Sequence, residues 1–60
     1  MTMQGGELKA IREALGWGQR KFAEEIGMTQ TFIGLMERGE RPIERRTELA
    51  ARYLALTKGE

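Results

Sequence analysis

The 60-residue sequence contains no cysteine, histidine, aspartate, serine, asparagine or valine. Without cysteine it has neither a disulfide framework nor a thiolate zinc site. Without serine, cysteine and histidine, the common nucleophile–base pairs of hydrolases cannot be built. The acidic side chains are all glutamates, scattered along the chain. We therefore expect no enzymatic activity, no metal site and no cofactor.

Length and hydropathy restrict the possible functions further. Sixty residues make one domain with a thin core, which leaves no room for a sensor domain or a small-molecule ligand. There is no signal peptide and no long apolar run, so we expect a cytoplasmic protein with no membrane partner. The formal net charge is only +1, which by itself says little about a nucleic-acid partner. Seven of the ten cationic residues are arginine, whose planar fork suits phosphate.

The spacing of apolar residues predicts four helices and no strand. In chain order these are about 7–15, 19–26, 30–38 and 44–56. Gly16, Gly27 and Gly39 stand where the first three helices should end, and Thr29 stands where the third needs an N-cap. The sequence thus predicts an all-α domain at 7–56, between a flexible leader at 1–6 and a tail at 57–60. The core-facing residues expected in the last helix are Leu49, Ala50, Tyr53 and Leu54.

The second and third predicted helices have the spacing of a helix-turn-helix. Ala23 falls where two such helices cross most closely, and Gly27 falls in the turn, where a positive φ costs glycine least. The expected apolar seam beneath both helices consists of Phe22, Ile26, Met28, Ile33 and Met36. This arrangement holds one helix so that its start can enter a DNA groove.

The entry of the second helix carries two further signals. Trp17 and Phe22 have the spacing of a hydrophobic staple. Arg20 and Lys21 lie in the first turn, where each exposed cation opposes the helix dipole by roughly 0.3–1 kcal/mol. A phosphate docked on this turn would make the two cations stabilising, because it binds free N–H groups and pairs with both cations. A solvated charged face is the other interpretation of these residues.

The segment LKAIREALGWGQRKFAEEIGMTQTFIGLMERGERPI resembles the Cro/CI (XRE-type) helix-turn-helix regulators of phages and bacteria. Within it, GMTQTFIGLMERGE is particularly similar to the recognition segment of lambdoid phage repressors, and the likeness extends over about 8–56. The resemblance implies a compact, lambda-repressor-like four-helix bundle with its third helix in the major groove. It further implies a transcriptional regulator, acting as a repressor and a homodimer on an inverted-repeat operator in double-stranded DNA.

The resemblance also implies roles for single residues in the third helix. Gln30 would bind adenine through two hydrogen bonds, and Thr31 would touch a base edge. Leu35 would meet a thymine methyl group, although a place in the core is the alternative. Gly34 would leave room for the DNA to approach. Phe32 either stacks on the nucleic acid or packs inside the protein, and we favour packing.

A second group of residues is implied to bind the DNA backbone: Gln19, Arg20, Lys21, Arg38, Arg41 and Arg45. Arg45 stands where relatives often have an apolar residue, so it either thins the core or reaches back to the phosphates. Arg12 and Glu37 match a pair that bridges the first and third helices in this family, which is a structural role.

Two further departures from the family pattern qualify this interpretation. Gly18 replaces the usual side-chain cap of the second helix, and the fifth short helix of many relatives is absent. The sequence therefore does not identify the dimer interface. The apolar candidates for it are Ile43, or Tyr53, Leu54 and Leu56. The alternative function is an antitoxin-type protein-interaction module that binds DNA secondarily, although little chain remains after the last helix to wrap a partner.

Overall fold

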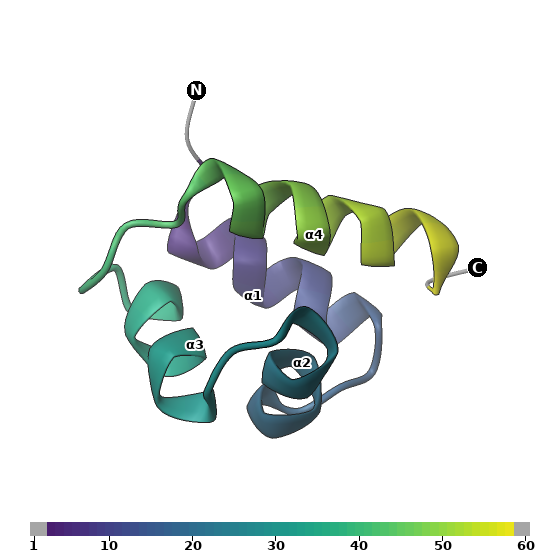
Figure 1. Ribbon diagram of the computed structural model, residues 1–60, viewed down its shortest axis with the longest axis horizontal. Helices are drawn as coiled ribbons and strands as arrows, with labels where there is room; N and C mark the ends of the chain where they lie inside the picture. The colour runs from purple at the N-terminus through teal and green to yellow at the C-terminus, as the bar shows by residue number, and fades with distance from the viewer. Residues whose placement is uncertain (1–2, 59–60) are drawn as a thin grey trace.

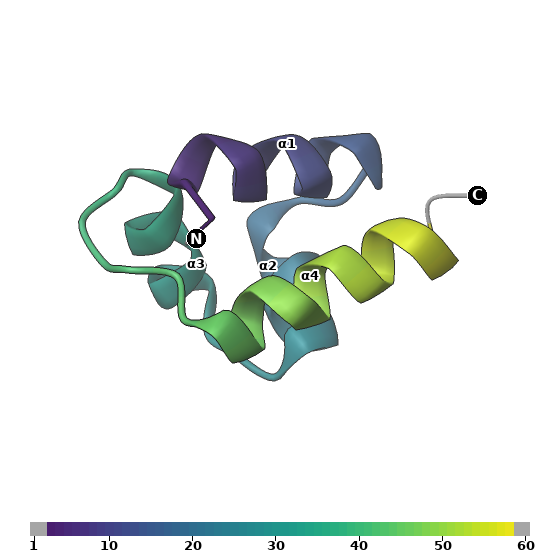
Figure 2. The ribbon, with the colours of Figure 1, turned by 90° about the horizontal axis from the view of Figure 1, so that it is seen from above.

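The computed structural model describes residues 3–58, which fold into four helices. These are α1 (Gly5–Ala14), α2 (Gln19–Ile26), α3 (Gln30–Glu37) and α4 (Arg45–Thr57). α1 and α4 lie against each other, with α2 and α3 packed beneath them (Figures 1 and 2). The all-α, four-helix fold predicted from the sequence is confirmed. None of the described helices is long and apolar enough to cross a membrane.

The first helix begins earlier than the periodicity predicted. The backbone N–H of Gln4 donates to the Glu7 carboxylate at 3.0 Å, which helps to close the first turn from Gly5 onward. Met3 is only 4% exposed and belongs to the core. The predicted flexible leader is therefore wrong for residues 3–6, because the apolar side chain of Met3 holds this segment. Residues 1 and 2 lie outside the described part of the chain.

The start of α1 lies directly against the end of α3. A Cβ atom at Gly5 would collide with the backbone carbonyl oxygens of Met36 and Glu37. The approach is favourable because the positive N-terminal end of one helix dipole meets the negative C-terminal end of another. Glycine at position 5 therefore allows a helix-to-helix contact that a side chain would prevent.

The predicted ends and caps of the helices are largely as expected. Gly16, Gly27 and Gly39 have φ angles of 76°, 74° and 81°, and each follows the end of a helix. The Thr29 hydroxyl accepts a hydrogen bond from the Phe32 N–H at 3.2 Å and caps α3. α4 runs one residue further than expected, to Thr57, so the predicted tail begins at 58 instead. Residues 59 and 60 lie outside the described residues.

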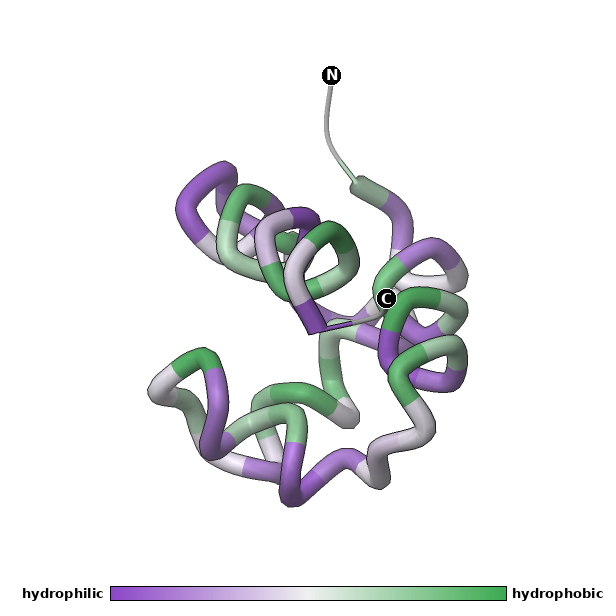
Figure 3. The backbone as a smooth tube through the Cα atoms, turned by 90° about the vertical axis from the view of Figure 1, so that its right-hand side faces the viewer, coloured by the Kyte–Doolittle hydropathy of each residue, from purple (hydrophilic) through white to green (hydrophobic). Residues whose placement is uncertain are grey.

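The core lies where the four helices meet. Its buried hydrophobic residues are Met3, Leu8, Phe22, Ala23, Ile33, Met36, Ile43, Ala51 and Leu54. Partly buried side chains that pack against them include Trp17, Ile26, Met28 and Phe32. The predicted helix-turn-helix seam is therefore confirmed, as is the packing of Phe32. Each helix carries both hydrophobic and hydrophilic residues along its length, as expected of amphipathic helices (Figure 3).

The rotation of α4 differs from the prediction. Leu49 and Tyr53 are 53% and 65% exposed, although both were expected to face the core. The buried side is instead formed by Thr47, Ala51 and Leu54. Successive residues are about 100° apart around a helix, so Leu49 and Tyr53 lie almost opposite Ala51. α4 has two apolar stripes, and the one with the small residue Ala51 packs against the bundle.

Candidate nucleic-acid interface

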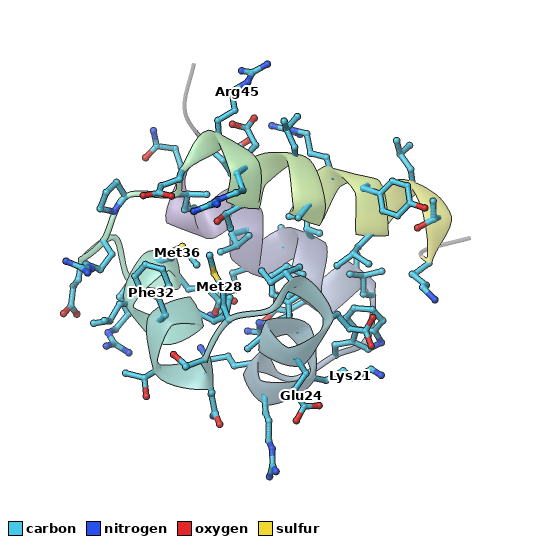
Figure 4. The ribbon with its side chains drawn as sticks, in the orientation of Figure 1. Lys21, Glu24, Met28, Phe32, Met36 and Arg45 are labelled. Atoms are coloured by element: carbon cyan, nitrogen blue, oxygen red, sulfur yellow. The ribbon has the colours of Figure 1, made fainter. Side chains whose placement is uncertain are left out.

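α2 and α3 both begin at the lower edge of the molecule in Figure 1 and rise toward α1 and α4. Ala23 is buried between the helices and Gly27 makes the left-handed turn, as predicted. Four residues of the first turns of these helices are exposed: Arg20, Lys21, Gln30 and Thr31. We call the surface that they form the helix-start surface. In Figure 4 the labelled side chains of Lys21 and Glu24 project from α2 at the lower right of the molecule.

A side-chain network behind this surface joins α1, α2 and α3. The Arg12 Nε donates to Glu37 Oε2 at 2.6 Å, and its Nη2 donates to Glu37 Oε1 at 3.1 Å. The third nitrogen, Nη1, donates to the Trp17 carbonyl oxygen at 2.9 Å. The side chains of Arg12 and Glu37 are only 12% and 4% exposed. The Arg12–Glu37 bridge implied by the family resemblance is present, and it also holds the connection between α1 and α2.

The charge of Glu37 is stabilised despite its burial. Burial alone would raise the pKa of this carboxyl group, but the hydrogen bonds from Arg12 and Gln19 and the arginine charge outweigh it. The net result is a pKa below the usual value of a glutamate. The hydrogen bond to Glu37 likewise raises the pKa of Arg12. The pair is therefore ionised at neutral pH.

Gln19 takes part in this network. Its Nε2 donates to Glu37 Oε1 at 3.1 Å, which ties the first residue of α2 to the last residue of α3. The half-buried amide thus already has a protein partner, a contact that sequence reasoning missed. If Gln19 also binds a phosphate, it does so with the part of its amide group that the bond to Glu37 does not use.

Gly34 lies beside two of the protein's own side chains. The residue is buried, and a Cβ there would lie 3.3 Å from Arg38 Nη1 and 3.7 Å from Gln19 Oε1. The space beside Gly34 is thus used by two of the protein's own side chains. The role of Gly34 in leaving room for the DNA to approach stays a prediction. Leu35 is half-buried, which leaves both of its predicted roles open.

The cations on α2 are paired with acids one turn further along the helix. Arg20 Nε lies 3.5 Å from Glu24 Oε2, and Lys21 Nζ lies 3.1 Å from Glu25 Oε2. The Lys21 ammonium also lies 5.3 Å from the centre of the Trp17 ring. The i, i+4 spacing of these charges in the sequence is a signal that could have predicted both ion pairs. The cations are exposed, but the helix-start surface is less positive than they alone would make it.

The loop after α3 presents two further arginines. Arg38 Nε donates to Glu40 Oε2 at 2.8 Å, and the Arg41 guanidinium lies 5.5 Å from the centre of the Phe32 ring. Both arginines are exposed. The ring of Phe32 therefore supports Arg41 from the protein side. This places the two predicted backbone-binding residues on one loop that directly follows the third helix.

Arg45 does not join the other predicted phosphate-binding residues. Its side chain points away from α2 and α3, on the far side of α4 (Figure 4). The prediction for Arg45 is wrong because α4 presents its opposite side to the bundle. Sequence spacing alone does not determine how the start of α4 is rotated relative to α3.

Comparison with known proteins agrees with this geometry. Residues 5–60 match a family model described as a helix-turn-helix domain. Comparisons with curated proteins and with solved structures give no match. The matched residues include all four helices and the turn at Gly27. The chain therefore belongs to the helix-turn-helix family, in agreement with its Cro/CI-type sequence features.

Proposed function

We propose that this protein is a sequence-specific regulator of transcription that acts as a repressor on double-stranded DNA, with α3 in the major groove. The observation that carries the proposal is the helix-start surface. Gln30 and Thr31 are exposed on the first turn of α3, beside the cations that begin α2. A groove-binding helix needs this combination, because base contacts give specificity while phosphate contacts fix its position.

The chemistry of the exposed residues fits the two kinds of contact. The Gln30 amide has the donor and acceptor that match the N7 and N6 groups of adenine. At the start of α2, the N-cap Gly18 offers no side chain to the first backbone N–H groups. Those groups remain available to a phosphate oxygen, which the helix dipole also attracts. Arg20 on α2 and Arg38 and Arg41 in the loop after α3 are exposed and supply positive charge for further phosphate contacts.

We further propose that two copies bind an inverted repeat in the cytoplasm, where operator DNA is accessible. One recognition helix covers only a few base pairs, which gives too little specificity against genomic competitors. Two copies related by a two-fold axis read half-sites about one helical turn apart. An RNA duplex is a poor alternative, because its deep, narrow major groove excludes a helix. Binding, without catalysis, is the whole proposed activity.

Selection of bound duplexes from a random DNA library tests this proposal. We expect enrichment of one motif with two inverted halves, and loss of that enrichment for Gln30→Ala. Gln4→Ala is a matched control, because Gln4 is also an exposed glutamine but lies at the start of α1. A library that gives no enriched motif would contradict a sequence-specific regulator.

A further inference from the structure

Arg41 is held by an aromatic ring, whereas the other exposed cations at α2 and after α3 are held by glutamates. The central carbon of its guanidinium lies 5.5 Å from the centre of the Phe32 ring, within the range of a cation–π contact. The ion pairs of Arg20, Lys21 and Arg38 with glutamates have N···O distances of 3.5, 3.1 and 2.8 Å. Within the part of the chain that the structure describes, no carboxylate lies within ion-pair distance of Arg41.

This difference matters for binding an anion. A glutamate beside a cation offsets part of its charge and repels phosphate, whereas an aromatic ring attracts the cation and carries no net charge. Lys21 also lies over a ring, that of Trp17 at 5.3 Å, but Glu25 pairs with it as well. An arginine held by a ring alone is restrained and keeps its full charge. A restrained side chain also loses less conformational entropy when it binds a ligand.

The angular positions of residues around α3 determine which flank of the helix carries this contact. Gly34 faces the start of α2, because a Cβ atom there would lie 3.7 Å from Gln19 Oε1. Phe32 precedes Gly34 by two residues, which is about 200° around the helix, so its ring lies on the opposite flank. Thr31 and Leu35 lie at angles between these two flanks, on the side of α3 that is not packed against the core.

The outward side of α3 is therefore bordered by α2 on one flank and by the Phe32–Arg41 contact on the other. In Figure 4, Phe32 lies at the left of the molecule, whereas Lys21 on α2 lies at the lower right. A helix with its side chains is about 10–12 Å wide and the major groove is about 12 Å wide, so the phosphates of one strand lie on each side of a groove-bound helix. The start of α2 offers Arg20 and uncapped backbone N–H groups to one strand. Arg41 faces the other strand.

We propose that Phe32 is a positioning residue for DNA binding, because its ring holds Arg41 so that the guanidinium binds phosphates on the flank of α3 away from α2. The inference rests on the proposed function, since it assigns the second flank of the same surface. Phe32 acts through Arg41 and needs no contact of its own with DNA. Its ring is half-buried and packs against the core, so the fold itself fixes the support for Arg41.

A double-mutant cycle on a duplex of random sequence tests this coupling. Arg41→Ala should weaken binding about five- to tenfold at about 0.1 M salt and reduce the slope of log K against log salt by about 1, because one phosphate contact is lost. Phe32→Leu should weaken binding about two- to fivefold, which corresponds to the loss of an exposed cation–π contact. In the Arg41→Ala background, Phe32→Leu should cost nothing further, because the ring has no cation to hold. Fluorescence anisotropy of the labelled duplex compares the four proteins.

Two control variants separate positioning from packing. Phe32→Tyr keeps the aromatic face and should bind DNA as the wild type does. Ile11→Ala removes apolar volume from another partly buried residue that packs against the core, and it should leave affinity and salt slope unchanged. Circular dichroism checks that each variant is folded at the temperature of the titration. In the free protein, the ring current of Phe32 should shift the Arg41 δ-proton resonances upfield of those of Arg45, and Phe32→Leu should remove this shift.

An equal loss from Phe32→Leu in both backgrounds would overturn the inference, since the ring would then act on the fold or on the DNA directly. An Arg41→Ala protein with unchanged affinity and salt slope would overturn it as well. The proposed function fails separately. If selection from a random library yields no motif but the cycle shows the coupling, the protein binds DNA through Arg41 without reading its sequence. If a motif is enriched but the cycle is additive, the positioning role alone fails.

Discussion

Arg12 and Glu37 are joined by two hydrogen bonds, of 2.6 and 3.1 Å, across the contact between α1 and α3. The carboxylate also accepts from Gln19 on α2, so one acidic group meets three helices. Because both partners are largely buried, losing one would leave the other as an uncompensated charge. The network therefore affects the stability of the domain and the position of the α2 start together.

Arg12→Ala should destabilise the domain by about 3 kcal/mol, the cost typical of breaking a buried ion pair. A 60-residue domain has a total stability of roughly 3–9 kcal/mol, so much of the protein would unfold. Adding Glu37→Gln to Arg12→Ala should recover part of the loss, because it removes the unpaired charge. Urea denaturation measures both effects. An unchanged midpoint for Arg12→Ala would mean that the pair contributes little.

The lowered pKa of Glu37 predicts loss of stability in acid. In the unfolded chain a glutamate titrates near pH ~4.3, whereas in the folded protein it stays ionised to lower pH. Its contribution is thus complete above that value and is lost as the pH falls through the folded pKa. Thermal melts at successive pH values should show a steeper acid loss for the wild type than for Glu37→Gln. Parallel profiles for the two proteins would contradict this linkage.

Gln30→Ala should lose roughly 1–3 kcal/mol of binding energy on the preferred DNA site and little on random DNA. The reason is that a bidentate base contact carries discrimination, while general affinity comes from the phosphates. Fluorescence titration with both duplexes at one salt concentration measures the difference. Equal losses on the two duplexes would show that Gln30 does not read a base.

Arg20→Ala and Arg38→Ala should weaken binding to specific and random DNA about equally. Each should reduce the slope of log K against log salt by about 1, since each phosphate contact releases about one counterion. Arg45→Ala is the matched control, because Arg45 points away from α2 and α3 and should leave the slope unchanged (Figure 4). A loss limited to one DNA sequence would instead make the residue a base reader.

Glu24→Gln should tighten DNA binding several-fold at low salt. Glu24 Oε2 lies 3.5 Å from Arg20 Nε, beside the helix-start surface, where the carboxylate both pairs with that cation and would repel a phosphate. The gain should shrink as salt rises, because screening weakens both effects. Glu13→Gln on α1 removes the same charge from an exposed position and should change binding less. Weaker binding by Glu24→Gln would mean that the ion pair holds Arg20 in its binding position.

Local chemistry explains which parts of the structure the sequence could predict. The positions of Gly27 and Thr29 follow from backbone and capping preferences that act within a few residues. The order of the helices and the seam around Phe22 follow from apolar spacing. The exposure of Gln30 was expected because it begins the third helix, and the structure agrees.

The remaining features depend on how whole helices meet. The outward rotation of Leu49 and Tyr53 depends on α4 packing through Ala51, which has the smaller side chain. Arg45 faces away for the same reason. The burial of Met3 and the approach of Gln19 to Gly34 depend on neighbours distant in the sequence, which no local pattern names. Sequence spacing thus predicted the helices better than their orientation.

Through the close contact at Gly5, the beginning of α1 supports the C-terminal end of α3, the helix proposed to enter the major groove. The carbonyl groups of Met36 and Glu37 lie directly against Gly5, and the loop that carries Arg38 and Arg41 starts immediately afterwards. A larger residue at position 5 would therefore push on the end of α3 and displace that loop. For anyone attaching a label or fusing a partner to this domain, the exposed side of α1 is a safer site than its first turn.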